Sequence, residues 1–298
     1  MPEEIVLAPD EAPKKLENFL KKRFPVGYVR KLFRKSGIRL NGKHPKPDEV
    51  VRAGDRIVFY IPFETSAAPP RPGKAVARIE IIFEDNSLLI LDKPAGLAVQ
   101  EGRTVTKRES VLGVIESRYR EKGITPKLVH RLDQDTSGLL LVAKGQETAD
   151  QLESLFETRQ VEKSYLCLLA GRLPQNEGVI DSPLPGRDGK PVRAVTRFEV
   201  EKRFSDTTLA RVRIETGRMH QIRLHFAKLG YPVVMDDQHG DFAFNKRFRK
   251  QYGLKRQFLH AASLTLDYVG KKRTWTAPLP EDLAATLRAL EGKQIKKA

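Results

Sequence analysis

The sequence predicts an α+β protein in which a large domain, with a mostly antiparallel mixed sheet and flanking helices, follows a small α/β domain. Two observations support this prediction. The segment Glu64–Lys74, ETSAAPPRPGK, is rich in proline and small residues that favour an extended linker. Beyond it, many short apolar segments are separated by short turns, with few helices that could connect parallel strands. We therefore expect domains at residues 1–65 and 77–298, joined by a linker at 66–76.

The small domain is expected to contain two helices followed by two short strands. Its helices are predicted at residues 12–24 and 27–37, and its strands at 38–43 and 55–61. Leu16, Phe19 and Leu20 recur at helical spacing in the first helix. Asn41-Gly42 predicts a hairpin turn after the first strand. The pattern therefore predicts a compact unit.

Positive charge dominates the two predicted helices of the small domain. Nine basic residues lie along them, namely Lys14, Lys15, Lys21, Lys22, Arg23, Arg30, Lys31, Arg34 and Lys35. Glu17 is the acidic residue that opposes them. A solvated helix face usually mixes both signs, so this one-sided charge favours contact with phosphate groups. The predicted contacts are Lys31, Arg34 and Lys35.

The sequence of the large domain predicts strands and helices in alternation, followed by a hairpin and a final helix. Strands are expected at 77–85, 87–96, 139–143, 164–171, 194–204 and 207–217, and helices at 109–120, 147–160 and 219–230. A hairpin is expected from 258–269 and 271–279, followed by a helix at 281–292. The helix at 147–160 is amphipathic, with an inner face made by Ala149, Leu152, Leu155 and Phe156.

Charge and composition narrow the range of partners. The chain has 54 lysine and arginine residues against 38 acidic ones, a formal net charge of +16 that favours a polyanion such as nucleic acid. A membrane surface is less favoured, because the sequence has no lipidation signal and no apolar run long enough to span a bilayer. The acidic N-terminus lacks a signal-peptide pattern, and the single cysteine, Cys167, lies in an apolar run that predicts a core position. These features predict a soluble protein of the reducing cytoplasm.

The segment VHRLDQDTSGLLLVAK, Val129–Lys144, combines charged residues with a buried strand. Leu139–Ala143 is continuously apolar and predicts a core strand, and Asp135–Gly138 predicts the turn before it. A carboxylate at the end of a core strand is costly unless it is hydrogen-bonded, paired or used in chemistry. Taken alone, Asp133 and Asp135 would most simply cap backbone amides in the turn.

Two later segments carry polar residues of complementary chemistry. Lys163 and Tyr165 open an apolar strand, and the segment ETGRMHQIRLHF supplies Arg218, His220, Gln221, Arg223 and His225. With Asp133, these segments provide a carboxylate, a phenol and a guanidinium. The three groups can act together only if the fold brings them into one cleft.

These motifs resemble those of the RluA family of pseudouridine synthases. His130–Gly138 matches the family's His-Arg-Leu-Asp-x-x-Thr-Ser-Gly motif at every specified position, and Tyr165 matches its Lys-x-Tyr element. Gly217–His225 matches the later Gly-Arg-x-His-Gln-Ile-Arg-x-His element. The segment GLKRQFLHAASLTL matches the C-terminal hairpin of the branch that modifies large-subunit ribosomal RNA. The resemblance covers roughly residues 75–292.

Two positions depart from the family pattern. Met219 stands where a small hydroxyl residue is common, and Met235 stands where glycine usually precedes Asp236. Neither is one of the expected catalytic residues, so we expect them to affect local packing or the fit of RNA. Residues 13–63 resemble the S4 RNA-binding domain, which usually precedes the catalytic domain in this branch.

The resemblance implies isomerisation of uridine to pseudouridine in RNA, most simply 23S (large-subunit) ribosomal RNA or a ribosome precursor, with no cofactor, metal or obligate protein partner. Asp133 would be the nucleophile or base while the N1–C1′ bond breaks, the uracil turns and C5 joins the sugar. Arg223 would pair with Asp133, and Tyr165 would stack on the uracil beside C5. Arg131 would fill the gap left by the flipped nucleotide. Further RNA contacts would come from His130, Lys163, Arg218, His220 and Gln221.

Other functions fit these residues less well. His220 and His225 are five residues apart, off the spacing that aligns two metal ligands on a helix. Asp133 and Asp135 could in principle form a glycosidase pair, but the positive charge points to RNA instead of a carbohydrate. The main rival is a catalytically silent RNA-binding or ribosome-assembly protein on the same scaffold, which would not need Asp133, Tyr165 and Arg223 together. A synthase that acts on transfer RNA stays open.

Overall fold

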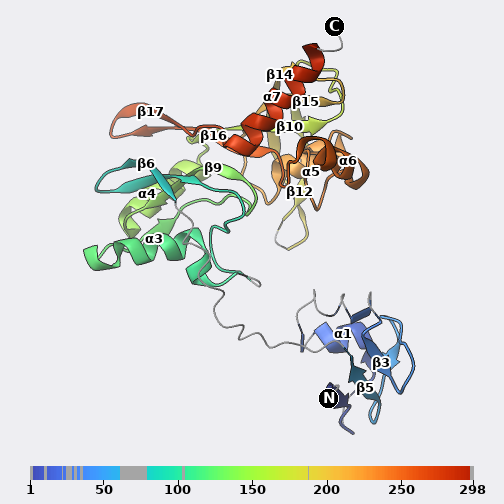
Figure 1. The fold of residues 1–298 in the computed structure, drawn as a ribbon. Helices are drawn as coiled ribbons and strands as arrows, with labels where there is room; N and C mark the ends of the chain where they lie inside the picture. Colours follow the sequence, from blue (N-terminus) through green and yellow to red (C-terminus); the bar gives the residue numbers. More distant parts are fainter. Residues whose placement is uncertain are drawn as a thin grey trace. The chain divides into compact units, whose positions relative to one another are not determined.

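The computed structural model describes residues 3–9, 12–21, 23–24, 29, 32–33, 36–60, 79–102, 105–186 and 188–295 (Figure 1). The chain divides into two compact units, Met1–Lys74 and Ala75–Ala298. The predicted linker at 66–76 lies outside the described residues. Within the described ranges, no helix is long and apolar enough to cross a membrane.

The smaller unit packs one described helix against short antiparallel strands. Its elements are β1 (Glu3–Val6), β2 (Lys14–Lys15), α1 (Leu16–Lys21), β3 (Ile38–Leu40), β4 (Val50–Val51) and β5 (Arg56–Phe59). The strands pair in the order β1-β5-β3, and β2 pairs with β4. Leu16, Phe19 and Leu20 of α1 are buried, as their helical spacing predicts.

One prediction for this unit needs correction, and another is confirmed. Lys14 and Lys15 lie in strand β2 and not in a helix, because their backbone pairs with β4. Asn41-Gly42 forms the predicted hairpin turn, with both residues at positive φ and Leu40 bridged to Lys43, and the predicted second strand, β5, pairs with β3. The predicted phosphate contacts, Lys31, Arg34 and Lys35, lie outside the described residues.

The larger unit contains a long sheet with helices on both faces. Its strands are β6 (Glu80–Glu84), β7 (Leu88–Lys93), β8 (Lys127–Leu128), β9 (Ser137–Ala143), β10 (Glu162–Ala170), β11 (Glu177–Asp181), β12 (Leu184–Pro185), β13 (Pro191–Val192), β14 (Val195–Arg203), β15 (Thr207–Ile214), β16 (Leu259–Tyr268) and β17 (Lys271–Thr276). Its α-helices are α3 (Val111–Tyr119), α4 (Gln146–Glu157), α5 (Gln221–Lys228), α6 (Phe242–Tyr252) and α7 (Glu281–Ile295), and short 3₁₀ helices flank α3 at Lys107–Glu109 and Arg120–Lys122.

The sheet order confirms the predicted fold class. The strands run β11-β14-β15-β10-β16-β9-β7-β6, with β17 paired to β16 and β8 to β9. The pair β9–β16 is parallel, and the other pairs in this sheet are antiparallel. The protein is therefore α+β with a mixed, mostly antiparallel sheet, because hairpin connections dominate over crossover helices.

Alternate residues of the central strands bury opposite faces of the sheet. On one face, α3 and α5 pack against β7, β9 and β10. On the other face, α4 covers β7 and β9, while α6 and α7 cover β10. Figure 1 shows α3 and α4 beside the β6–β9 half and α5, α6 and α7 beside the β10–β15 half. Because β9 is buried on both faces, its sequence is continuously apolar, as predicted.

The parallel contact between β9 and β16 fixes the start of β9. Strand β9 begins at Ser137, so the turn predicted at Asp135–Gly138 is shorter than expected. Gly138 has a φ of 108°, and a Cβ there would lie 2.2 Å from the Ala261 carbonyl oxygen. The Ser137 hydroxyl hydrogen-bonds Nδ1 of His260 at 3.0 Å. The loop that carries Asp133 is therefore fixed to the C-terminal hairpin.

Candidate active site

A cavity of about 790 Å³ opens beside the loop that precedes β9. Its walls come from this loop, the start of β10 and the entry to α5. Nine predicted site residues of the larger unit line it, namely His130, Arg131, Asp133, Lys163, Tyr165, Arg218, His220, Gln221 and Arg223. The fold thus brings the three sequence motifs into one cleft.

Asp133 is held in this cavity by a buried arginine. Nη1 of Arg223 donates to Oδ2 of Asp133 at 2.9 Å. The same guanidinium makes a bidentate pair with Asp236, with Nε–Oδ2 at 2.6 Å and Nη2–Oδ1 at 2.8 Å. The side chains of Arg223 and Asp236 are 4% and 0% exposed, whereas that of Asp133 is 21% exposed. Asp236 therefore holds Arg223 in place, and Arg223 holds the Asp133 carboxylate at the cavity.

The charges of this cluster stabilise one another. Burial works against the charged form of Arg223, but hydrogen bonds to Asp236 and Asp133 raise its pKa above the usual range. Burial also works against the carboxylate of Asp236, yet the bonds from Arg223 and from the backbone of His239 and Gln238 lower its pKa. Both groups stay ionised, so Arg223 carries a full positive charge next to Asp133.

Tyr165 lies at a break in the strand register of β10. The pairing between β10 and β16 shifts between Ser164 and Tyr165, which is a β-bulge. The extra residue of the bulge, Ala262, lies on β16, and β10 keeps its regular alternation, so Tyr165 points to the same face as Cys167 and its phenol lines the cavity with 6% of the residue exposed. Burial, and then the charge of Asp133, raise the pKa of Tyr165. Tyr165 is therefore a neutral phenol at neutral pH, close to the Asp133 carboxylate.

Lys163 and His130 stand on the wall with Phe156. The His130 ring stacks on Phe156 at 4.8 Å, and Nζ of Lys163 lies 5.1 Å from the centre of the same ring. Nε2 of His130 accepts the Leu141 backbone N–H at 2.9 Å, and burial lowers the pKa of His130 to about 3. Burial lowers the pKa of Lys163 to about 8. His130 is thus a neutral ring that holds the loop to β9, whereas Lys163 offers a cation to the cavity.

The segment at the start of α5 contains both exposed side chains that can contact RNA and buried side chains that hold the segment in place. Gln221 was predicted to bind RNA, but it is buried, and its amide bonds Thr216, Thr196 and backbone groups on both sides. It therefore fixes the segment, because its donors and acceptors are already used. Arg131 and Arg218 are exposed at the rim of the cavity. Their guanidinium groups can reach an RNA backbone.

The two departures from the family pattern have clear structural positions. Met219 is 69% exposed and lines the cavity, so its side chain is open to that cavity. Met235 has a φ of 63°, a left-handed conformation that explains why glycine is common there. Its backbone N–H donates to Oδ1 of Asn245, whose Nδ2 donates to the Asp236 carbonyl. Met235 thus supports the segment that carries Asp236.

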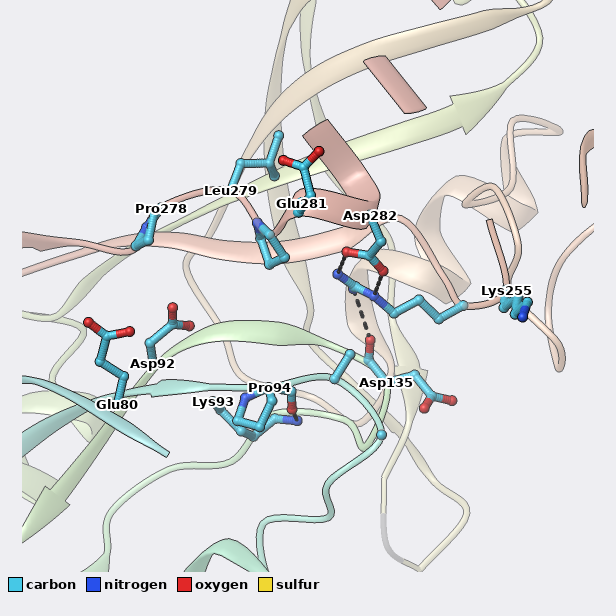
Figure 2. Close-up of a pocket in the computed structure, with 14 residues that line it drawn as sticks. Glu80, Asp92, Lys93, Pro94, Asp135, Lys255, Pro278, Leu279, Glu281 and Asp282 are labelled. Atoms are coloured by element: carbon cyan, nitrogen blue, oxygen red, sulfur yellow. Dashed lines mark hydrogen bonds and ion pairs between the residues drawn. The ribbon is translucent and has the colours of Figure 1, made fainter. Parts of the chain in front are cut away.

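The sequence analysis did not identify the side chains that support residues 134–136, of which Lys93 is labelled in Figure 2. Lys93 is fully buried, and its Nζ donates to the carbonyls of Pro94, Leu97 and Gln134 at 2.8–2.9 Å. Arg256 reaches the Asp135 carbonyl at 3.4 Å, and Nε2 of Gln257 donates to the Thr136 hydroxyl at 2.7 Å. A lysine or arginine of this kind is indistinguishable from a surface residue in the sequence. Only its burial shows that it supports residues 134–136.

The fold and the cavity define an enzyme that offers one fixed carboxylate and several cations to a polyanionic substrate. The model of the RNA pseudouridylate synthase family matches residues 87–228. Over 97% of its length, this chain is 34% identical to ribosomal large subunit pseudouridine synthase C of Salmonella typhi, of which 97% is covered. The protein of the same description from Escherichia coli (strain K12) is also 34% identical, with 96% of each chain covered.

A solved structure shares the fold of the larger part of the chain. Human RNA pseudouridylate synthase domain containing 4 aligns with a TM-score of 0.61 and 25% identity, covering 71% of this chain and 92% of that one. The chain belongs to the RNA pseudouridylate synthase family, as its motifs predicted. It is therefore an isomerase that converts uridine to pseudouridine in RNA.

Proposed function

We propose that the protein isomerises specific uridines of 23S, large-subunit, ribosomal RNA in the cytoplasm, with Asp133 as the nucleophile or base. Its relatives are described as ribosomal large subunit pseudouridine synthases. The net charge of +16 and the cations that line the cavity suit a large RNA substrate. No cofactor is required, because the bonds made and broken balance.

The anchoring of Asp133 is the observation that carries this proposal. Arg223 takes Oδ2 and leaves Oδ1 open to the cavity. That oxygen can add to the uracil ring, capture C1′ or remove a sugar proton while the N1–C1′ bond breaks. Because its raised pKa keeps Tyr165 neutral, the phenol must give up its own proton as it takes the proton from C5. Lys163, Arg131 and Arg218 hold the flanking RNA.

The direct test maps pseudouridine in ribosomal and transfer RNA from cells with and without the gene. Complementation with the wild type should restore specific 23S positions, and complementation with Asp133→Asn should not. Restored positions in transfer RNA alone would contradict the substrate. Restoration by the Asn variant would contradict the role of Asp133, and no missing position in either RNA would favour a silent RNA-binding protein.

We also propose that the smaller unit is an S4-like RNA clamp. Lys14, Lys15 and Lys21 are among its basic residues, although Lys21 also pairs with Glu17. Deleting residues 1–70 should weaken binding to large RNA and flatten its salt dependence, by somewhat less than about one log unit per log salt for each lost phosphate contact. The single-turnover rate at saturating RNA should change little. Unchanged affinity and salt slope would contradict the clamp, and lost turnover with normal binding would place the unit at the cleft.

A further inference from the structure

The two oxygens of Asp133 have different neighbours. Oδ2 accepts from Arg223 at 2.9 Å, whereas Oδ1 faces Nε2 of His220 at 3.8 Å. The side chains of Asp133 and His220 are 21% and 22% exposed, and both line the cavity. The oxygen that the arginine leaves open is therefore flanked by an imidazole nitrogen. A uracil that reaches Oδ1 also comes within reach of this nitrogen.

A second imidazole stands behind the first. Nδ1 of His220 lies 3.0 Å from Nε2 of His239, and the rings meet edge to face with centres 5.2 Å apart. His239 is half-buried and is not one of the residues that line the cavity. Its backbone N–H donates to Oδ1 of Asp236 at 3.0 Å, which fixes it to the group that anchors Arg223. The pair thus links the cavity wall to a surface outside the cavity.

The charges around His220 select the position of its hydrogen. One hydrogen lies between Nδ1 of His220 and Nε2 of His239, and either nitrogen could carry it. The Asp133 carboxylate favours a hydrogen on the His220 nitrogen that faces it, Nε2. Nδ1 is then an acceptor, and His239 donates to it. Burial lowers the pKa of His220 despite the pull of Asp133, with Arg223 and His239 also lowering it and Asp236 raising it. The ring is therefore neutral and ready to pass a proton.

The reaction needs such a proton. When N1–C1′ breaks and C5–C1′ forms, C5 loses its hydrogen and N1 must gain one. Both transfers occur in a cleft that bound RNA covers. A path through side chains can carry a proton in and out of such a cleft.

We propose that His220 and His239 form a proton relay that delivers a proton from solvent to N1 of the detached uracil beside Asp133. His220 gives its Nε2 hydrogen to N1 and takes the Nε2 hydrogen of His239, which solvent replaces at Nδ1. Tyr165 takes the C5 proton and gives its own proton to Nε2 of His220, from which a proton leaves by the same path, so both rings regain their starting tautomers and the protons balance. This inference rests on the proposed role of Asp133.

The test compares His220→Gln, His239→Gln and His239→Ala with the wild type in single turnover at saturating RNA. We expect rate losses of about 10²-fold for His220→Gln and about tenfold for both His239 variants, with RNA affinity within about threefold. Gln at 239 can still donate a hydrogen bond to His220 but cannot accept and give a proton as imidazole does. Added imidazole should restore His239→Ala, while the wild type and Asp133→Asn should not respond to it.

The outcomes separate the relay from an orienting role. A wild-type rate for His239→Gln, or a slow His239→Ala that imidazole does not restore, overturns the relay. If His239→Ala does not fold, His239→Gln alone decides: a loss of rate supports the relay and a wild-type rate overturns it. Turnover by Asp133→Asn contradicts the proposed function itself. Full loss in Asp133→Asn with wild-type His220→Gln contradicts the relay only.

Discussion

Two cavities, a front one beside Asp133 and a back one beside Asp135, are lined by residues of the loop Asp133–Thr136. The front cavity, of about 790 Å³, is lined by Asp133 and Thr136, and the back cavity, of about 690 Å³, is lined by Asp135 (Figure 2). Each has an arginine held by an aspartate through two hydrogen bonds. Arg223 pairs with Asp236 in front, and Arg256 pairs with Asp282 behind. Each arginine also reaches the loop.

The two arginines differ in burial and in what they hold. Arg223 and Asp236 are 4% and 0% exposed, and the third contact of Arg223 is a carboxylate. Arg256 and Asp282 are 12% and 47% exposed, and the third contact of Arg256 is a backbone carbonyl. The buried pair therefore fixes the carboxylate that we propose reacts, whereas the half-exposed pair fixes only the backbone of the loop that carries it.

The two lysines differ in the same way. Behind the loop, Lys93 gives its hydrogens to three backbone carbonyls, and burial lowers its pKa to about 7. In front, Lys163 lies over the Phe156 ring, and burial lowers its pKa to about 8. The front lysine can therefore serve a ligand, while the back lysine is committed to the protein.

The largest expected contrast is between the two aspartates of the loop. Asp133→Asn should lower the single-turnover rate by about 10³-fold or more, because the amide is neither a nucleophile nor a base. Its matched control, Asp135→Asn, keeps the backbone carbonyl that Arg256 contacts and should stay within about threefold of the wild-type rate. RNA affinity should change by less than about 1 kcal/mol in both variants. The rates are measured by tritium release from 5-tritiated uridine. Equal losses of rate in the two variants would contradict a distinct role for Asp133.

The next effect concerns the phenol of the front cavity. Tyr165→Phe should lower tritium release by about 10²-fold while RNA affinity stays within about threefold, because the ring keeps its packing and loses only the hydroxyl. Release at the wild-type rate would leave Tyr165 as a packing residue.

A smaller contrast is expected in stability. Arg223→Met should cost about 3–5 kcal/mol in the free energy of unfolding, because it leaves the buried Asp236 carboxylate unpaired. Arg256→Met should cost only about 1 kcal/mol, because water can solvate the half-exposed Asp282. The Arg256 variant should also lose about tenfold in turnover as the loop shifts. Urea denaturation of both variants measures the contrast, and the reverse order would refute it.

The smallest effect is the pH dependence of RNA binding. Below a pKa of about 8, Lys163 is charged and attracts phosphate, and above it the attraction is lost. We expect the Kd for RNA to rise by about threefold between pH 7 and pH 9, at constant salt, and this rise to vanish in Lys163→Met. Bound phosphate stabilises the charged form, so the rise should extend above pH 8. An unchanged pH profile in Lys163→Met would assign the rise to other groups.

Strong local patterns made most of the fold predictable. The apolar run Leu139–Ala143 predicted β9, and the periodicity of residues 147–160 predicted α4. Helix α6 was missed because Phe242, Phe244 and Phe248 alternate with basic residues without a clear apolar face, and Phe242 is 66% exposed. Short strands such as β12 and β13 were missed because two-residue elements leave no periodicity to read.

The sequence motifs placed Asp133, Tyr165 and Arg223 in one cleft, as the structure has them. Their supports could not be predicted, because a supporting role depends on a partner far along the chain. Asp236 is identified only by its pair with Arg223 on α5. Gln221 was assigned to RNA because a polar residue in a binding motif is indistinguishable, in sequence, from one that bonds its own backbone.

The parallel contact between β9 and β16 also sets the order in which the protein can mature. Ser137 and His260 are bonded across 123 residues of chain, so closing this loop carries an entropic cost that local turns do not. The antiparallel hairpins of the sheet can form as soon as their strands leave the ribosome, but the backbone beside Asp133 must wait for the C-terminal hairpin. Because Ser137 and Gly138 pair with His260 and Ala261, a nascent chain that ends before β16 lacks the support that this pairing gives to the loop carrying Asp133.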